Sequence, residues 1–227
     1  MRAYVTANHG DDEPGLVGER LVQRGYRLTM LLREDCEGWP ALDDADLVVS
    51  LGSEWSVYWD HVAEPVQAEV ALLRKAHERG VPVLGICFGS QLMATALGAQ
   101  VERAPAADVE IGWFDVVTVP GAPTVVGGRW FQWHYDRWAV PLGAELLAGT
   151  AGANQVFRVG RTLAVQYHPE VTPAVVSRWT GLADGDELCA AGIDPSSLVD
   201  ETVRALADVT ARTNALVDWF CDEVASS

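Results

Sequence analysis

Residues 81–97 read VPVLGICFGSQLMATAL, and this stretch decides the fold. Its first part, 81–86, is an apolar run that suits a buried strand, and its last part, 90–97, suits an apolar helix. Glycines at 85 and 89 mark a sharp turn between the two. The absence of charge from Gly80 to Val101 resembles a membrane span, but Pro82 and these glycines divide it, so we expect a strand followed by a helix.

The sequence on both sides continues this alternation. Further strands and helices are predicted in the first half at 2–6, 15–24, 26–32, 47–51 and 65–79. Short β-like runs and a long helix, kinked or in two parts, are predicted in the second half at 113–119, 130–133, 155–159, 162–167 and 196–224. We therefore expect an α/β fold of one domain, 1–227, with a three-layer, open, mostly parallel sheet and helices on both faces.

The charge balance excludes several classes of partner. The chain has 16 Lys and Arg against 32 Asp and Glu, a formal net charge of −16. A surface of this sign repels nucleic-acid phosphates and anionic lipids, so we expect no nucleic acid and no membrane as partners. The N-terminal residues lack the basic start and apolar core of a signal peptide, which predicts a cytoplasmic protein.

The turn at 85–89 has the pattern Gly-x-nucleophile-x-Gly, with Cys87 at the nucleophile position. Such an elbow forces its central residue into a strained conformation and exposes its side chain at the start of the next helix. A helix N-terminus lowers the pKa of a thiol, and the amide of Phe88 can face a developing oxyanion. Taken alone, the pattern also fits a small cysteine packed between glycines.

A second candidate element, His168-Pro169-Glu170, follows an apolar strand. Residues i and i+2 of an extended chain point to the same side, so Glu170 can orient the imidazole of His168, which in turn can activate Cys87. Taken alone, this tripeptide fits a surface turn equally well.

Together the two elements resemble the class I glutamine amidotransferase family, whose G-x-C-x-G-x-Q elbow and downstream H-P-E match residues 85–91 and 168–170. Three further segments are similar to family motifs: Gly52 with residues 56–58 to G-G-P-x-S-V-Y, residues 110–113 to E-x-G-W, and residues 133–136 to the H-G-D segment. The sequence is most similar to stand-alone members that resemble the amidotransferase domain of GMP synthetase. The resemblance implies a flavodoxin-like sheet.

The resemblance also implies a glutaminase reaction without a cofactor. Cys87 would attack the side-chain carboxamide of glutamine, with His168 as the base and Glu170 as its orienting acid. The amides of Phe88 and of the Gly52-Ser53 segment would form the oxyanion hole. Gln91 would contact the glutamine, and the backbone near Trp133 and His134 would hold its α-amino and α-carboxyl groups.

Two departures from the family pattern affect the substrate site. Ser53 and Glu54 replace the second glycine and the proline of the oxyanion loop, so a loop that requires positive φ would be imperfect or would form only with substrate. Tyr135 replaces the glycine of H-G-D and narrows the rim where the α-groups bind. The substrate is therefore either glutamine or another γ-glutamyl compound.

The other candidate residues carry no predicted role. Cys36, Cys189 and Cys221 have no neighbouring base in the sequence. The acidic run after His9 suits a solvated loop better than a metal site, and we expect no metal. Most tryptophans are expected to pack in the core.

Three functions follow from this interpretation. The first is a glutaminase that releases ammonia to a separate synthetase, because the chain carries no P-loop signature of its own. The second is a free-standing γ-glutamyl hydrolase. The third is a non-catalytic regulatory or binding homologue, which has no chemical need for Cys87, His168 and Glu170 together.

Overall fold

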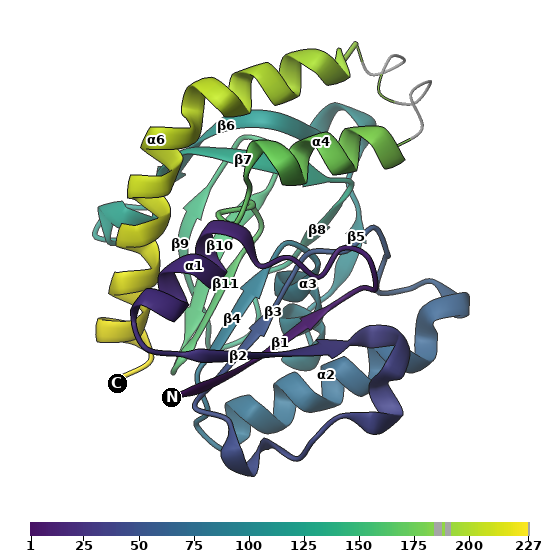
Figure 1. The fold of residues 1–227 in the computed structure, drawn as a ribbon, viewed down its shortest axis with the longest axis vertical. Coiled ribbons are helices and arrows are strands. Elements are labelled where there is room, and N and C mark those ends of the chain that lie inside the picture. The colour runs from purple at the N-terminus through teal and green to yellow at the C-terminus, as the bar shows by residue number, and fades with distance from the viewer. Residues whose placement is uncertain (184–187, 189–191, 227) are drawn as a thin grey trace.

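In the computed structural model, which describes residues 1–183, 188 and 192–226, nine strands form one sheet in the order β2-β1-β3-β4-β11-β10-β9-β6-β7 (Figure 1). The first five strands in this order are parallel: β2 (Arg27–Leu32), β1 (Arg2–Ala7), β3 (Leu47–Ser50), β4 (Val83–Ile86) and β11 (Thr162–Val165). The other four are antiparallel: β10 (Asn154–Val159), β9 (Glu145–Gly149), β6 (Glu110–Thr118) and β7 (Gly128–His134). A separate antiparallel pair joins β5 (Val101–Arg103) to β8 (Asp136–Trp138).

Helices cover both faces of the parallel strands. One face carries α1 (Gly15–Gln23) and α6 (Pro195–Trp219), and α6 continues into a π-helical turn, Phe220–Val224. The other face carries α2 (Ala63–Glu78) and α3 (Phe88–Ala96). Helix α4 (Pro173–Leu182) follows β11 and packs beside α6 (Figure 1).

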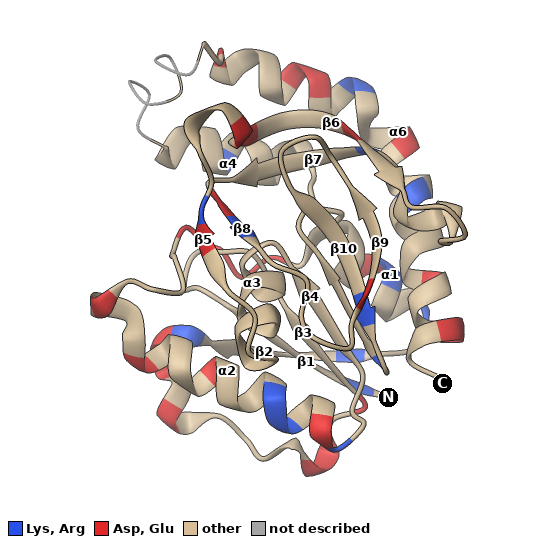
Figure 2. Ribbon diagram, turned by 180° about the vertical axis from the view of Figure 1, so that it is seen from behind, with Lys and Arg blue, Asp and Glu red and all other residues tan. Residues whose placement is uncertain are grey.

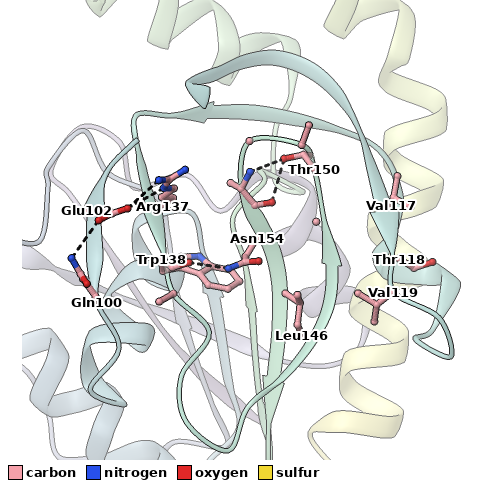
Figure 3. Close-up of a pocket in the computed structure, with 15 residues that line it drawn as sticks. Gln100, Glu102, Val117, Thr118, Val119, Arg137, Trp138, Leu146, Thr150 and Asn154 are labelled. Atoms are coloured by element: carbon pink, nitrogen blue, oxygen red, sulfur yellow. Dashed lines mark hydrogen bonds and ion pairs between the residues drawn. The ribbon is translucent and has the colours of Figure 1, made fainter. Parts of the chain in front are cut away.

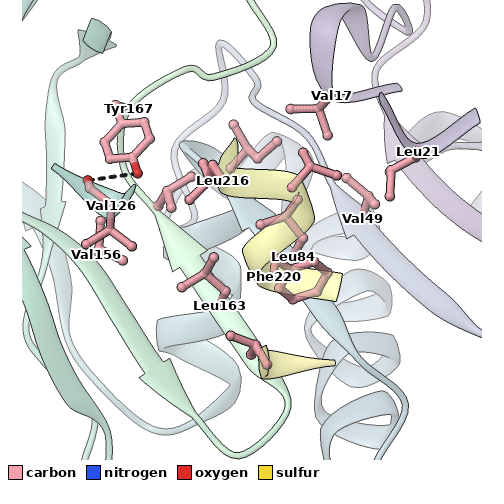
Figure 4. Close-up of a cluster of buried hydrophobic side chains, with 14 of the residues drawn as sticks. Val17, Leu21, Val49, Leu84, Val126, Val156, Leu163, Tyr167, Leu216 and Phe220 are labelled. Carbon is pink, nitrogen blue, oxygen red and sulfur yellow. Dashed lines mark hydrogen bonds between the residues drawn. The ribbon is translucent and has the colours of Figure 1, made fainter. Parts of the chain in front are cut away.

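The core has two halves, one on each face of the sheet, because successive side chains of a buried strand point to opposite faces. In β3, Val49 contributes to the cluster under α1 and α6, whereas Val48 contributes to the cluster under α2 and α3. In the first cluster, Leu216 and Phe220 at the C-terminal end of the chain pack over Leu84 of β4 (Figure 4). The C-terminal helix is thus part of the core that supports the central strands.

Acidic residues are distributed over the outer helices rather than gathered at one place (Figure 2). Several are paired with arginines that join distant parts of the chain. Asp218 of α6 accepts hydrogen bonds from Arg20 of α1 at 2.9 and 2.6 Å, and Arg24 binds the same carboxylate at 2.9 Å. These ion pairs fix the C-terminal helix against α1. None of the helices in the described part of the chain is long and apolar enough to cross a membrane.

The predicted fold class is confirmed: the sheet is open and mostly parallel in its first half, and helices cover both faces. The predicted strands and helices of the first 86 residues are all present, with ends that differ by one to two residues. The predicted helix 90–97 starts too late, because α3 already begins at Phe88. Three short strands, β5, β8 and β9, were not predicted, and the predicted strand 162–167 ends at Val165. The long C-terminal helix is continuous and ends in the π-helical turn.

Candidate active site

The turn after β4 holds Cys87 in a strained backbone conformation. Cys87 has φ 50° and ψ −106°, and among the residues that the structure describes it is the one non-glycine residue with positive φ. A residue in such a region costs about 1–3 kcal/mol and persists only where its surroundings fix it. The elbow therefore has the strained geometry that its sequence predicts, and Cys87 lies at the N-terminus of α3.

The two glycines of the elbow allow three backbone segments to meet. A Cβ atom on Gly89 would lie 2.1 Å from the carbonyl oxygen of Ser50, and one on Gly85 would lie 2.8 Å from the carbonyl oxygen of Gly89. Both distances are far below van der Waals contact, so β3, β4 and α3 can approach only because side chains are absent here. The first hydrogen bonds of α3 run from the amides of Ser90 and Gln91 to the carbonyl of Cys87. The amide of Phe88, the first residue of the helix, therefore has no acceptor within the helix.

His168 and Glu170 form a buried pair just beyond β11. The Nδ1 atom of His168 lies 2.7 Å from Oε1 of Glu170, and the side chains are 4% and 3% exposed. The backbone amide of His168 donates to the carbonyl of Phe131 in β7 at 2.8 Å. This pairing leaves Nε2 of His168 as the ring nitrogen that faces away from the acid, without a hydrogen-bond partner among the described residues.

The segment that carries this pair is held from two helices. The amide of Leu16 in α1 donates to the carbonyl of Glu170 at 3.0 Å, and the hydroxyl of Thr213 in α6 donates to the carbonyl of Pro169 at 2.7 Å. Gly15 has φ +44°, and a Cβ there would lie 1.9 Å from the Glu170 carbonyl oxygen. The sequence interpretation missed Gly15 and Thr213. A glycine rather than a capping residue at the start of a predicted helix was the one signal for Gly15.

The charges around His168 favour its protonated form. Burial by itself lowers the pKa of the imidazole, but the electrostatic influence of Cys87 and Glu170, with the hydrogen bond to Glu170, raises it well above its ordinary value. The Gly52 backbone lies beside both side chains, so Cys87 and His168 belong to one site. An imidazolium beside a thiolate is the charge state in which a cysteine is a nucleophile.

Two further groups contact the sulfur of Cys87. Its Sγ lies 3.7 Å from the carbonyl oxygen of Trp133, which accepts, and 3.6 Å from Nε2 of Gln166, which donates. Gln166 is fully buried, and the sequence interpretation gave it no role. A donor aimed at the sulfur stabilises a thiolate more than a thiol.

The loop after β3 lies against the same pair. A Cβ on Gly52 would lie 3.0 Å from Cε1 of His168 and 3.7 Å from Cβ of Cys87, so this backbone borders both side chains. Neither Gly52 nor Ser53 has positive φ. The condition on which an imperfect loop was expected, a positive φ at Ser53, is therefore not met in this conformation.

The residues predicted to bind substrate differ in burial and in their contacts. Gln91 is 3% exposed in the first turn of α3. The side chain of His134 is also buried, between the carboxylate of Glu110 at 3.0 Å and the carbonyl of Asp136 at 3.0 Å, so only its backbone can serve a ligand. Tyr135 lies under the guanidinium of Arg103, which is 5.2 Å from the ring centroid.

An aromatic wall covers His168 on one side. The ring centroid of Trp179 in α4 lies 4.8 Å from that of His168 and 6.1 Å from that of Trp133. The indole nitrogen of Trp179 donates to Asp11, whose carboxylate also binds Arg178 at 2.6 Å. The acidic loop near His9 is thus tied to α4 by these contacts. Trp179 was missed because helix 173–182 carries no motif.

Two further cysteines, Cys36 and Cys221, lie on other elements than this centre. Cys36 is partly buried and Cys221 is buried under α1 and α6, and burial raises the pKa of both thiols. Cys189 lies outside the described residues. A surface pocket of about 610 Å³ lies between β5, β8 and β9 (Figure 3), but its lining includes neither Cys87 nor His168.

Comparison with known proteins agrees with this geometry. The family model "Glutamine amidotransferase class-I" matches residues 59–177, just over half of the chain. A GMP synthase (glutamine-hydrolysing) from Aeropyrum pernix is 32% identical over 174 residues, which are 70% of this chain and 31% of the relative. The HisH subunit of imidazole glycerol phosphate synthase from Moorella thermoacetica is 34% identical over 122 residues, 44% of this chain and 58% of the relative.

Solved structures extend the similarity over the whole fold. A glutamine amidotransferase from Thermotoga maritima has a TM-score of 0.87 and 26% identity, and the match covers 98% of this chain and 99% of that one. A second, from Methylobacillus flagellatus, has a TM-score of 0.83 at 22% identity, which supports the fold alone. The chain spans less than a third of the length of the curated GMP synthases that it matches. The resemblance predicted from the motifs is confirmed: the chain belongs to the class I glutamine amidotransferase family.

Proposed function

We propose that the protein hydrolyses the side-chain amide of glutamine at Cys87 and supplies the ammonia to a separate synthetase. The observation that carries this proposal is the meeting of three features that are remote in sequence. They are the strained elbow at Cys87, the buried His168–Glu170 pair, and the Gly52 backbone against both. A non-catalytic homologue has no need for an elbow that costs folding free energy.

The first step would form a γ-glutamyl thioester. The sulfur of Cys87 attacks the amide carbon, the carbonyl oxygen takes up negative charge, and His168 gives a proton to the amide nitrogen as the C–N bond breaks and ammonia leaves. Water then attacks the thioester, His168 accepts its proton, and glutamate leaves as the thiol re-forms. Glu170 holds the imidazole through Nδ1, which leaves Nε2 as the ring nitrogen that would exchange the proton with the sulfur and the leaving group.

The oxyanion would be held by backbone amides. The amide of Phe88 is outside the helical ladder, and the Gly52-Ser53 peptide lies beside Cys87 and His168. Each well-aimed donor of this kind lowers the barrier by about 3–4 kcal/mol. The α-amino and α-carboxyl groups would lie near the backbone of Trp133 and His134, with Gln91 and Tyr135 beside them.

A separate acceptor fits the coverage of the relatives. The chain matches 31% of the Aeropyrum GMP synthase, and the HisH relative is named as a subunit of a synthase. A second candidate function is a free-standing γ-glutamyl hydrolase. It is favoured by Tyr135, which would narrow the rim of the substrate site and whose ring centroid lies 5.2 Å from the guanidinium carbon of Arg103.

The test is ammonia release from a panel of γ-glutamyl compounds, with glutamine, γ-glutamyl amines and γ-glutamyl peptides as substrates. We expect release from glutamine, abolished in Cys87→Ala, and a higher kcat/KM when an ATP-dependent amidating synthetase is added. Activity confined to γ-glutamyl amines or peptides would move the assignment to the hydrolase. A diazo-ketone analogue of glutamine should add once, at Cys87, and labelling at Cys36 or Cys221 in its place would contradict the assignment.

A further inference from the structure

A buried ion pair lies at the carboxyl ends of β1 and β3. The Nε atom of Arg33, which directly follows β2, lies 2.7 Å from Oε2 of Glu69 in α2, and the side chains are 1% and 0% exposed. The strand order reverses between β1 and β3, and many open α/β sheets bind their ligands at that point. In this chain two charged side chains occupy the position.

Every donor of the Arg33 guanidinium has a partner. Its five N–H groups match five acceptors: Oε2 of Glu69 at 2.7 Å, Oε1 of Glu69 at 3.4 Å, Oδ1 of Asn8 at 2.6 Å, the carbonyl of Leu51 at 2.7 Å and the carbonyl of Gly52 at 2.9 Å. Two of these acceptors are consecutive carbonyls of the loop that borders Cys87 and His168. The guanidinium therefore holds the loop backbone itself.

Glu69 is held just as firmly. Its Oε1 accepts the hydroxyl of Ser50 in β3 at 2.6 Å and the hydroxyl of Thr6 in β1. Since both strands belong to the core, the carboxylate fixes the position of Arg33 relative to the sheet. A shift of the guanidinium would leave buried donors and acceptors without partners.

The contacts of Arg33 set the direction of the Gly52–Ser53 peptide. A trans peptide is planar, so its N–H points opposite to its C=O. Because the carbonyl of Gly52 points at Arg33, the amide of Ser53 points away from Arg33. Rotation of this peptide would turn the N–H of Ser53 toward Arg33 and would break the hydrogen bond that Arg33 donates to the carbonyl of Gly52.

Arg33 also contacts the other expected oxyanion donor. Its guanidinium carbon lies 5.1 Å from the ring centroid of Phe88, the first residue of α3. One buried side chain thus binds the backbone of the loop after β3 and packs against the side chain of the first residue of α3.

We propose that Arg33, held by Glu69, is a positioning residue that fixes the Gly52–Ser53 peptide in the orientation that stabilises the oxyanion. This inference rests on the proposed glutaminase function. Arg33 donates to the loop carbonyls and not to the sulfur of Cys87, so it would act on the transition state through the peptide. It should therefore affect kcat far more than substrate binding, and it should leave the thiolate of Cys87 unchanged.

The test compares Arg33→Lys with Arg161→Lys. Arg161 is a matched control, because it also donates to backbone carbonyls, those of Gly80 at 2.6 Å and Ala225 at 2.7 Å, at the opposite end of the sheet. In Arg33→Lys we expect kcat for the best γ-glutamyl substrate to fall by about 10- to 100-fold, with KM within about threefold, since one oxyanion donor is misdirected. Arg161→Lys should keep both constants.

A second measurement separates positioning from general damage. Alkylation of Cys87 by iodoacetamide needs the thiolate but forms no oxyanion, so its rate, followed on the Cys87 peptide by mass spectrometry, should be the same in Arg33→Lys and wild type. Amide hydrogen exchange in the peptide 50–57 should be faster in Arg33→Lys than in Arg161→Lys. Equal losses in kcat and alkylation rate would show a disrupted elbow and would overturn the inference.

A double variant covers the case in which Arg33→Lys does not fold. Arg33→Met with Glu69→Leu removes both charges together, and apolar replacements of a buried pair are often tolerated. The same loss of kcat with unchanged alkylation is expected. Unchanged kcat/KM in a folded variant overturns the positioning role and leaves the glutaminase proposal intact. If wild type releases no ammonia from any γ-glutamyl compound, the proposed function fails. Amide exchange in 50–57 that is the same in Arg33→Lys and Arg161→Lys would then overturn the positioning role of Arg33 as well.

Discussion

At the scale of single residues, the strain at Cys87 can be measured directly. Alanine keeps the Cβ atom that makes φ 50° unfavourable, whereas glycine adopts this conformation freely. Relief of about 1–3 kcal/mol of strain exceeds the larger unfolded-state entropy of glycine, about 0.4–1 kcal/mol. We therefore expect Cys87→Gly to have a free energy of unfolding about 1 kcal/mol above that of Cys87→Ala, although both are inactive.

Urea denaturation of the two variants checks this prediction. Ala94→Gly in the buried middle of α3 is the control, because a helical glycine there should lower the free energy of unfolding by about 1 kcal/mol. A Cys87→Gly variant less stable than Cys87→Ala would show that the elbow stores no strain.

A second prediction concerns the pH dependence that His168 gives to stability. Its pKa is raised well above the ordinary value, so its contribution to stability is fully present below about pH 6.5 and is lost as the pH rises through the folded pKa. Glu170→Gln removes one of the two charges that raise this pKa. The pH-dependent loss should then be smaller and should be complete at a lower pH.

The measurement is the free energy of unfolding from below about pH 6.5 to above the folded pKa of His168, in wild type, Glu170→Gln and a control, Glu201→Gln, whose carboxylate pairs with Arg129 away from the site. In the same proteins, Glu170→Gln should lower activity, whereas Glu201→Gln should keep it. His168→Ala should be more damaging than Glu170→Ala, because it removes the base and not only its orientation. Identical pH dependence in wild type and Glu170→Gln would contradict the assigned origin of the shift.

The sequence was most informative for residues whose chemistry demands a local pattern. Cys87 was predicted from the glycines on either side of it, and the His168–Glu170 contact from the spacing of two residues in an extended chain. Arg33, Glu69 and Gln166 were not predicted, because their roles depend on partners 18 to 79 residues away in the sequence. No local pattern marks a charge or an amide that a fold will bury.

At the scale of elements, the long apolar segments were predictable and the short ones were not. Strand β4 lies in a continuous apolar run and helix α2 has helical periodicity, whereas β5 and β8 have three residues each and are paired only with one another. Such strands exist because tertiary contacts join them, as when the indole of Trp138 donates to Ser90 of α3 at 3.0 Å. A period of two cannot be detected over three residues.

A third prediction concerns the link from α6 to the active site. Thr213→Val keeps the shape of the side chain but removes the donor to the carbonyl of Pro169, which lies between His168 and Glu170. A buried carbonyl that loses its donor costs about 1–3 kcal/mol. We expect that loss in the free energy of unfolding, together with a severalfold lower kcat and an unchanged KM.

Thr210→Val is the matched control on the same helix. The hydroxyl of Thr210 donates to the carbonyl of Leu206, one turn back in α6, so its loss leaves the segment at Pro169 untouched. The measurements are kcat, KM and the free energy of unfolding in urea for both variants. Equal effects of the two substitutions would show that α6 supports the site only through general stability.

At the scale of the whole molecule, the acidic excess opposes folding. The net charge of −16 is spread over a chain whose radius of gyration is roughly 17 Å for its length. At an ionic strength of about 0.01 M the Debye length is ~30 Å, so like charges interact across the entire molecule. At about 0.15 M it is ~8 Å, and only near neighbours interact.

The fourth prediction is that Tm rises between these two salt concentrations. Salt also weakens the surface ion pairs, but each of these contributes at most about 1 kcal/mol. The charges of a pair such as Arg137–Glu102 are 3.1 Å apart, which is shorter than the Debye length of ~8 Å, so the pair is only partly screened. The relief of long-range repulsion should therefore dominate. Calorimetry in sodium chloride measures the shift, and neutralising the exposed Asp12, Glu19 and Asp60 should reduce it, whereas Arg204→Gln should enlarge it. A lower Tm at high salt would mean that ion pairs such as those of Asp218 outweigh the repulsion of the whole chain.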